Sequence, residues 1–264
     1  MTNAIASLFS RSLGMRLFVD SGALVLGAIL AAVGFTALRA DRVADQWVAE
    51  TLAASRAAQI RYESQRIARL RLLSRLVAGD PGFVAYVAEG DAASIHDLLL
   101  ERQRDLQCDL AVVLDRHGLI LARTDRAGGH GEDLSRRPLV SEAMRLGEAS
   151  GVWTDGERHW TAVAVPLVSG GELAEGILVT GLAIDDALAL DVRRQSGAEV
   201  AFMTLLPKPR IIASTLASDG GLSAAVARQV DLRRLLAGPA DAPLRINLDG
   251  RRWVVQATAL AAAD

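Results

Sequence analysis

Two tryptophans, Trp153 and Trp160, lie close together in a chain in which aromatic residues make up only 4%. They flank Asp155 and Gly156, a dipeptide typical of a β-hairpin turn. A turn centred on Gly156 and Glu157 places the two rings opposite each other on one face of the hairpin. A turn one residue earlier shifts the register and separates them. The pair therefore predicts either a stacked core contact or the aromatic wall of a pocket for a small solute.

Two adjacent arginines form a second candidate. Arg136 and Arg137 follow Asp133 and Ser135 and come directly before the predicted start of a helix. A guanidinium group beside the free N–H groups of a helix start can bind a carboxylate or a phosphate. A solvated loop that caps the helix is the alternative interpretation, and the sequence leaves both open.

Catalytic and metal-binding motifs are absent from the sequence. It contains no Gly-Lys-Ser/Thr phosphate loop, no Gly-x-Ser-x-Gly elbow, no His-Glu-x-x-His and no Gly-x-Gly-x-x-Gly fingerprint. The four histidines stand far apart, and the single cysteine, Cys108, precedes a predicted strand as a small core residue does. We therefore expect no catalytic residue, metal or cofactor within this chain.

The charge balance excludes one class of partner. The 29 basic and 31 acidic side chains give a net charge of −2, and no arginine stripe is interleaved with aromatic residues, so nucleic-acid binding is not expected. With 51% hydrophobic residues, most of the chain can form a folded core.

Apart from Asp20 and Ser21, residues 17–38 form an unbroken run of apolar and small residues. Because about 20 helical residues span a bilayer core of roughly 30 Å, the run predicts a transmembrane helix. Arg11 and Arg16 precede it, which favours a cytoplasmic position for residues 1–16. A cleaved signal peptide is the alternative, although its apolar region is usually only about 7–15 residues long. Both interpretations place residues 41–264 in the periplasm.

Helix signals dominate the region that follows. Residues 41–78 contain no proline or glycine and carry an apolar stripe at helical spacing, which predicts a long stalk helix ended by a Gly-Asp-Pro-Gly turn. Two shorter helices are expected over residues 83–88 and 92–106, and Asp91 is expected to cap the second. The whole helical stalk region, residues 39–107, is expected to lead away from the membrane and to form a homodimer with a second copy.

Beyond Cys108 the apolar pattern changes to that of short strands separated by turns rich in glycine and aspartate. The predicted strands are residues 110–114, 119–122, 151–154, 160–168, 173–184, 199–205, 210–214, 244–248 and 251–260, and the predicted helices are residues 138–147, 185–194 and 222–236. This order predicts an α+β fold in which antiparallel sheets follow a helical N-terminal region.

Three segments of this pattern resemble a known family. Val112–Asp125 (VVLDRHGLILARTD), Asp133–Val140 (DLSRRPLV) and Gly176–Asp185 (GILVTGLAID) are similar to bacterial Cache sensor domains, the PAS-like extracytoplasmic modules of chemoreceptors, histidine kinases and diguanylate cyclases. The resemblance covers residues 108–197 as a membrane-distal Cache module, and residues 198–264 look like the smaller, second α/β module of double Cache sensors. It implies a PAS-like antiparallel sheet with a long N-terminal helix beside both modules.

By position, the resemblance also implies a ligand pocket on the sheet face of the first module. Amino-acid-binding members carry Trp-Tyr closely after an arginine of this loop, whereas Arg137 is followed by Pro138 and Leu139. The resemblance therefore does not imply an amino-acid ligand, and a small, anionic solute is expected instead. The implied pocket residues are Arg123, Asp125, Arg137, Trp153, Trp160 and Asp185.

The expected function is small-molecule sensing by the periplasmic part of a single-pass protein of the bacterial inner membrane, with ligand binding transmitted through the long N-terminal helix. Double Cache receptors continue into a second membrane helix and an output domain, and no further run of about 18 apolar residues follows here. One alternative is the input half of a diguanylate or adenylate cyclase or a histidine kinase, with its catalytic domain beyond residue 264. The other is a single-pass periplasmic interaction protein.

Overall fold

The computed structural model describes most of the chain. Backbone structure is given for residues 13–126, 128–168, 174–204, 210–216, 244–248 and 251–260. Side chains are described for these residues except 13–20, 34, 36–46, 244, 246–248 and 251–252. Two compact units make up the chain, Met1–Thr51 and Leu52–Asp264. The predicted helix over residues 222–236 lies outside the described residues.

Among the described residues, three helices precede the first strand, and the starts of α3 and α4 follow the expected capping chemistry. α2 is a single helix of 66 residues, Leu13–Ala78. α3 (Pro81–Glu89) begins at Asp80, and α4 (Ala92–Leu106) begins at Asp91; in both cases the aspartate side chain accepts a backbone N–H of the first turn. The predicted break after residue 78 and the cap at Asp91 are confirmed.

Within the part of the chain that the structure describes, no helix is long and apolar enough to cross a membrane. The predicted span, residues 17–38, includes positions whose side chains are not described. The membrane anchor therefore stays a prediction.

The following strands form a five-stranded antiparallel sheet in the order β2-β1-β5-β4-β3. Helix α5 (Pro138–Leu146) connects β2 to β3, with proline in its first turn and Gly147 at its C-terminal end, as predicted. The strands are β1 (Leu110–Asp115), β2 (Ile120–Arg123), β3 (Ala149–Asp155), β4 (Arg158–Leu167) and β5 (Gly176–Ala183).

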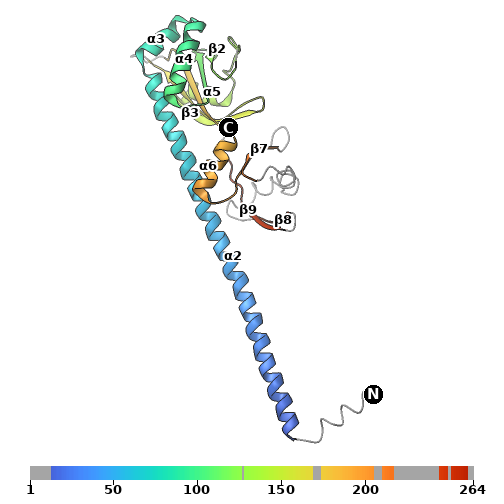
Figure 1. Ribbon diagram of the computed structural model, residues 1–264. Coiled ribbons are helices and arrows are strands. Elements are labelled where there is room, and N and C mark those ends of the chain that lie inside the picture. The colour runs from blue at the N-terminus through green and yellow to red at the C-terminus, as the bar shows by residue number, and fades with distance from the viewer. Residues whose placement is uncertain are drawn as a thin grey trace. The chain divides into compact units, whose positions relative to one another are not determined.

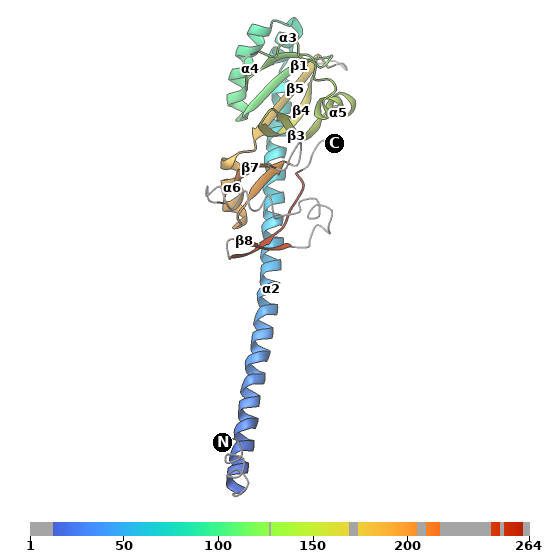
Figure 2. The ribbon, with the colours of Figure 1, turned by 90° about the vertical axis from the view of Figure 1, so that its right-hand side faces the viewer.

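Because successive side chains of a strand point to opposite faces, the sheet separates two apolar clusters. Val113, Val163 and Leu178 lie on the face covered by α2, α3 and α4, which we term the α2 face. Val112 and Val179 lie on the opposite face, which α5 covers and which we term the α5 face. Figure 2 shows α3 and α4 on one side of the sheet and α5 on the other.

A smaller third cluster forms around α6 (Asp186–Ser196) and two short strands, β6 (Ala201–Thr204) and β7 (Arg210–Ser214). Helix α6 lies beside β7 (Figure 1), and its apolar residues pack against Phe202 and Ala213. The two strands pair with each other, and a separate hairpin is formed by β8 (Leu244–Leu248) and β9 (Arg251–Val255).

Candidate functional site

The β3–β4 hairpin fixes the relation between the two tryptophans. Trp153 pairs directly with Trp160, and Asp155 pairs with Arg158, so the turn consists of Gly156 and its successor. This is the first of the two registers considered for the sequence, and the positive φ of 61° at Gly156 suits a residue without a Cβ. Both tryptophans are buried in the cluster of the α5 face, with 2% and 3% of their surface exposed.

Arg123 is the most completely neutralised charge near the hairpin. It ends β2 and is 3% exposed. Its Nε and Nη2 atoms donate to the two carboxylate oxygens of Asp125 at 2.7 and 2.9 Å, and Nη2 also donates to Asp155 at 2.6 Å. Burial by itself lowers the pKa of Arg123, but the hydrogen bonds to these carboxylates outweigh it and raise the pKa. Arg123 and Asp125 therefore satisfy each other.

Further ion pairs extend this contact into a balanced cluster. Arg158 donates to the Asp125 carboxylate at 2.9 Å, and Arg126 lies 2.8 Å from Glu132 and 3.7 Å from Asp155. Burial raises the pKa of Asp155, and the hydrogen bond and charge of Arg123 reverse that effect and lower it. Three guanidinium groups meet three carboxylates in this set, which we term the charge cluster: Arg123, Asp125, Arg126, Glu132, Asp155 and Arg158.

Arg137 is positioned differently from the arginines of the charge cluster. Its Cζ lies 4.9 Å from the centre of the Trp153 ring, and its Nη1 donates to the backbone oxygen of Thr154 at 2.6 Å. It forms no ion pair with a carboxylate of the described residues. The guanidinium of Arg137 therefore keeps unused N–H donors beside an aromatic ring, whereas Arg158, which stacks on Trp160 at 5.1 Å, is paired with Asp125.

The indole N–H of Trp153 is a buried donor without an acceptor in the described part of the chain. Buried indole N–H groups usually find a hydrogen-bond partner, and an unpaired one costs about 1–3 kcal/mol. Trp153 thus carries an unpaired indole N–H, and the guanidinium of Arg137, with unused donors, lies 4.9 Å from the centre of its ring. We term this region the Arg137–Trp153 corner, and its donors favour a molecule with oxygen acceptors.

Asp185, which the resemblance had placed in the pocket, lies at the start of α6, where a helix over residues 185–194 was predicted. β5 stops at Ala183, and Asp185 caps α6 by accepting the backbone N–H of Leu188 at 2.9 Å. Arg123, Asp125, Arg137 and the two tryptophans are thus brought together, while Asp185 serves the neighbouring helix.

Sequence reasoning missed Asp155, Arg158, Arg126 and Glu132. One signal was available, because Asp155 and Arg158 directly flank the two-residue turn and must therefore be cross-strand partners in the register that pairs the tryptophans. The contribution of Arg126 and Glu132 depends on the path of the loop after β2, which no periodic pattern reveals.

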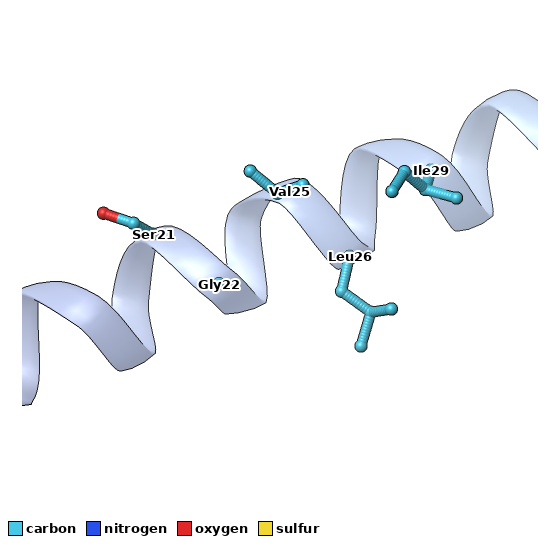
Figure 3. Close-up of a pocket in the computed structure, with 5 residues that line it drawn as sticks. All are labelled: Ser21, Gly22, Val25, Leu26 and Ile29. Atoms are coloured by element: carbon cyan, nitrogen blue, oxygen red, sulfur yellow. The ribbon is translucent and has the colours of Figure 1, made fainter.

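Other candidate residues have structural environments. Burial raises the pKa of the Cys108 thiol to about 12, so it is a core residue as expected. In the described part of the chain, histidine, cysteine and acidic side chains form no group suited to a metal ion. Figure 3 shows a shallow hollow whose lining comes entirely from α2: Ser21, Gly22, Val25, Leu26 and Ile29.

A five-stranded antiparallel sheet in the order 2-1-5-4-3, behind a long N-terminal helix and followed by a smaller module, is the architecture of PAS-like bacterial sensor domains. The family comparison gives the same class. Residues 49–264 match the dCache_3 family, described as the double sensory domain of two-component sensor kinases, and the chain belongs to this family.

Solved structures with a similar fold come from bacterial receptors. The ligand-binding domain of the Campylobacter jejuni chemoreceptor Tlp3, in complex with 4-methylisoleucine, is 12% identical with a TM-score of 0.50 over 77% of this chain and 81% of that chain. The periplasmic domain of Vibrio cholerae LuxQ is 14% identical with a TM-score of 0.46 over 78% and 100%. The Escherichia coli DcuS sensor domain is 14% identical with a TM-score of 0.42 over 54% and 99%.

At these identities the Tlp3 structure indicates the fold alone. The comparison with curated proteins gave no match. The chain is therefore a Cache sensor domain by family, and its ligand must be argued from its own residues.

Proposed function

We propose that this chain is the periplasmic sensing module of a bacterial membrane receptor and that it binds a small anionic solute at the Arg137–Trp153 corner of the α5 face. Family membership supports the sensing role. The observation that carries the choice of ligand is the position of Arg137, which lies on the Trp153 ring with free N–H donors and forms no ion pair within the described residues, although its charge helps to lower the pKa of Asp155. Arg123 and Arg158, in contrast, are neutralised by carboxylates. A carboxylate or phosphate oxygen satisfies both the guanidinium and the indole N–H.

The remaining predicted pocket residues support this corner in different ways. Trp160 lies across the hairpin from Trp153, and the Arg123–Asp125 pair holds the loop after β2 against the ends of β3 and β4. Asp185 caps α6 and is not part of the corner.

The ligand proposal is tested by thermal unfolding of the full-length protein, in detergent, against a panel of carboxylates, phosphates, amino acids and amines. A solute at about 100 times its Kd stabilises the folded state by about 2.7 kcal/mol. We expect stabilisation by one anionic class in the wild type, its loss in Arg137→Ala, and its retention in Arg136→Ala. Stabilisation by amines alone, or by no solute, would contradict the proposal.

The membrane position is a separate part of the proposal. The composition of residues 17–38, preceded by Arg11 and Arg16, supports an uncleaved helix that anchors residues 41–264 on the periplasmic side. Carbonate extraction of membranes followed by N-terminal sequencing tests it. We expect the protein in the membrane pellet with its N-terminal segment intact, and release of a shortened protein would contradict it.

A homodimer through α2 also belongs to this proposal. Leu72 and Leu76 lie one turn apart on α2 and are 60% and 65% exposed, which supports a partner on that face. Cross-linking of cysteines introduced at Leu72 in a cysteine-free Cys108→Ala background tests the contact. A disulfide between copies is expected, and purely monomeric protein at the same concentration would contradict it.

A second candidate is that the module is the input half of a signalling enzyme. The observation in its favour is the family description, which refers to two-component sensor kinases. Sequencing the gene beyond codon 264 tests it: a kinase or cyclase domain in frame supports this candidate, and a stop codon overturns it.

A further inference from the structure

Two buried hydroxyl groups join the long helix to the centre of the sheet. Ser74 of α2 and Thr180 of β5 are both 0% exposed, and their side-chain oxygens lie 2.6 Å apart. Thr180 pairs with Ala111 and Val163 on the α2 face, so the contact is enclosed by apolar side chains. In such surroundings neither hydroxyl can exchange its partner for water.

The hydrogen bonds of this pair have two discrete arrangements. Ser74 Oγ also lies 2.7 Å from the backbone oxygen of Leu70, one turn earlier in α2. Each hydroxyl carries a single proton. In one arrangement, Ser74 donates to the backbone oxygen of Leu70 and Thr180 donates to Ser74, so both protons are used. In the other arrangement, Ser74 donates to Thr180, and its bond to the Leu70 oxygen is lost. Serine bonds of this kind to the preceding turn bend a helix slightly, so the two arrangements differ in the geometry of α2.

The opposite face of β5 lies against Trp160, which is a predicted residue of the ligand pocket. Gly181 follows Thr180 and is paired with Leu110, so a side chain at this position would point to the α5 face. A Cβ at this position would lie 3.0 Å from the Cβ of Trp160 and 3.3 Å from the Cβ of Leu110. The Cβ of Trp160 therefore lies close to the bare backbone of β5 at Gly181, and its side chain shares the cluster of the α5 face with Val179 of the same strand.

We propose that Thr180 and Ser74 are positioning residues that couple Trp160 on the α5 face to helix α2. This inference rests on the proposed function, because it makes the α5 face the source of the signal. A solute that displaces Trp160 moves the β5 backbone at Gly181 and changes the separation of the two hydroxyls. Ser74 then exchanges one hydrogen-bond arrangement for the other, and α2 changes its bend at residues 70–74.

The coupling can be measured without a ligand, by hydrogen exchange of the α2 backbone amides around Ser74 in the full-length protein. Trp160→Phe keeps the Cβ but removes ring atoms from the cluster that includes Val179 of β5, and it is expected to change exchange in this turn by about threefold or more. In Thr180→Val the same Trp160 substitution is expected to have no effect on α2. Thr180→Ser keeps the hydroxyl and is expected to restore the effect, which a purely structural role of the threonine methyl would not do.

Two controls keep the test decisive. Thr161→Val changes a threonine of the neighbouring strand β4. In this background, Trp160→Phe is still expected to change hydrogen exchange around Ser74. If Thr180→Val does not fold, Ser74→Ala removes the same hydrogen bond from the helix side and is expected to abolish the effect. The coupling would be overturned if Trp160→Phe changed hydrogen exchange around Ser74 equally in the wild type and in variants without the hydroxyl pair. Because no solute is used, that result would leave the ligand proposal standing, while failure of the solute panel would leave the coupling result unchanged.

Discussion

The two faces of the five-stranded sheet are both buried and both apolar, yet they differ in how their polar groups are satisfied. On the α2 face, the hydroxyls of Ser74 and Thr180 satisfy each other. On the α5 face, Trp153 keeps an indole N–H without a partner in the described part of the chain, and Arg137 lies on its ring without a carboxylate. The hydroxyl pair needs no further partner, whereas the donors of Trp153 and Arg137 are suited to a second molecule.

The charge cluster at the edge of the α5 face offers the largest expected effect. Arg123→Ala leaves the carboxylate of Asp125, whose side chain is 1% exposed, without its bidentate partner. Removing one member of a buried ion pair costs about 3–5 kcal/mol, because the other charge stays buried. Urea unfolding should show this loss, whereas Arg116→Ala, an exposed arginine in the β1–β2 turn, should change the free energy of unfolding by less than about 0.5 kcal/mol. Equal, small losses in both variants would mean that the cluster does not hold the corner together.

Neighbouring valines on β1 compare the two faces directly. Val112 lies on the α5 face and Val113 on the α2 face, and both are 0% exposed. Truncating either to alanine should lower the free energy of unfolding by about 2 kcal/mol through lost burial and a small cavity. Only Val112→Ala should also weaken the response to the stabilising solute in the thermal unfolding panel. If Val113→Ala weakens that response as much, the distinction between the faces is wrong.

His159 gives a pH dependence of known sign. Its side chain is 7% exposed, and burial, aided by the charge of Arg210, lowers its pKa below the ordinary 6.5. Below pH 6.5, His159 therefore binds a proton in the unfolded chain but stays neutral in the folded chain. Because the unfolded state binds more protons, the free energy of unfolding falls as the pH drops towards the pKa of the folded state. The contribution is at most about 1.4 kcal/mol per pH unit.

Urea unfolding between about pH 7.5 and pH 5.5 measures this slope. His159→Gln should flatten it, while His117→Gln, at an exposed turn position, should leave it unchanged. The prediction fails if the His159 variant keeps the slope of the wild type.

The smallest effect is expected where α2 meets the sheet through an exposed ion pair. Arg75, whose side chain is 58% exposed, pairs with Glu148 just before β3. Exposed pairs contribute about 0–1 kcal/mol, so Arg75→Ala should barely change the free energy of unfolding, and high salt should remove even that difference. A loss as large as that of Ser74→Ala would mean that the surface pair, and not the buried hydroxyls, attaches the helix.

Much of the fold could be predicted because its signals are local. Apolar alternation located the strands, and the Gly-Asp-Pro-Gly turn and Asp91 set the helix ends now seen at α3 and α4. The hairpin register could not be chosen from the sequence, since both turns place acceptable residues at their centres, and sheet pairing decided it.

The site was predicted less completely than the fold. The structure brings Arg123, Asp125, Arg137, Trp153 and Trp160 together at the β3–β4 hairpin, and their role in a pocket stays a prediction. The charge state of the corner depends on long-range pairs. Asp155 and Arg158 become partners of Arg123 and Asp125 only once β2 and the hairpin are placed together. Asp185 lies at the start of the predicted helix and caps α6, so its side chain is used by that helix and not by the corner.

The most direct test of the account is the indole N–H signal of Trp153, observed by NMR in protein labelled with ¹⁵N-tryptophan and assigned with Trp153→Phe. The chain has four tryptophans, so the spectrum is simple. We predict that the stabilising anion moves the Trp153 signal downfield as the indole gains an acceptor, and that Arg137→Ala abolishes the shift while Arg136→Ala does not. A stabilising solute that leaves the Trp153 signal in place would contradict the account, because the unpaired donor would then have no part in binding.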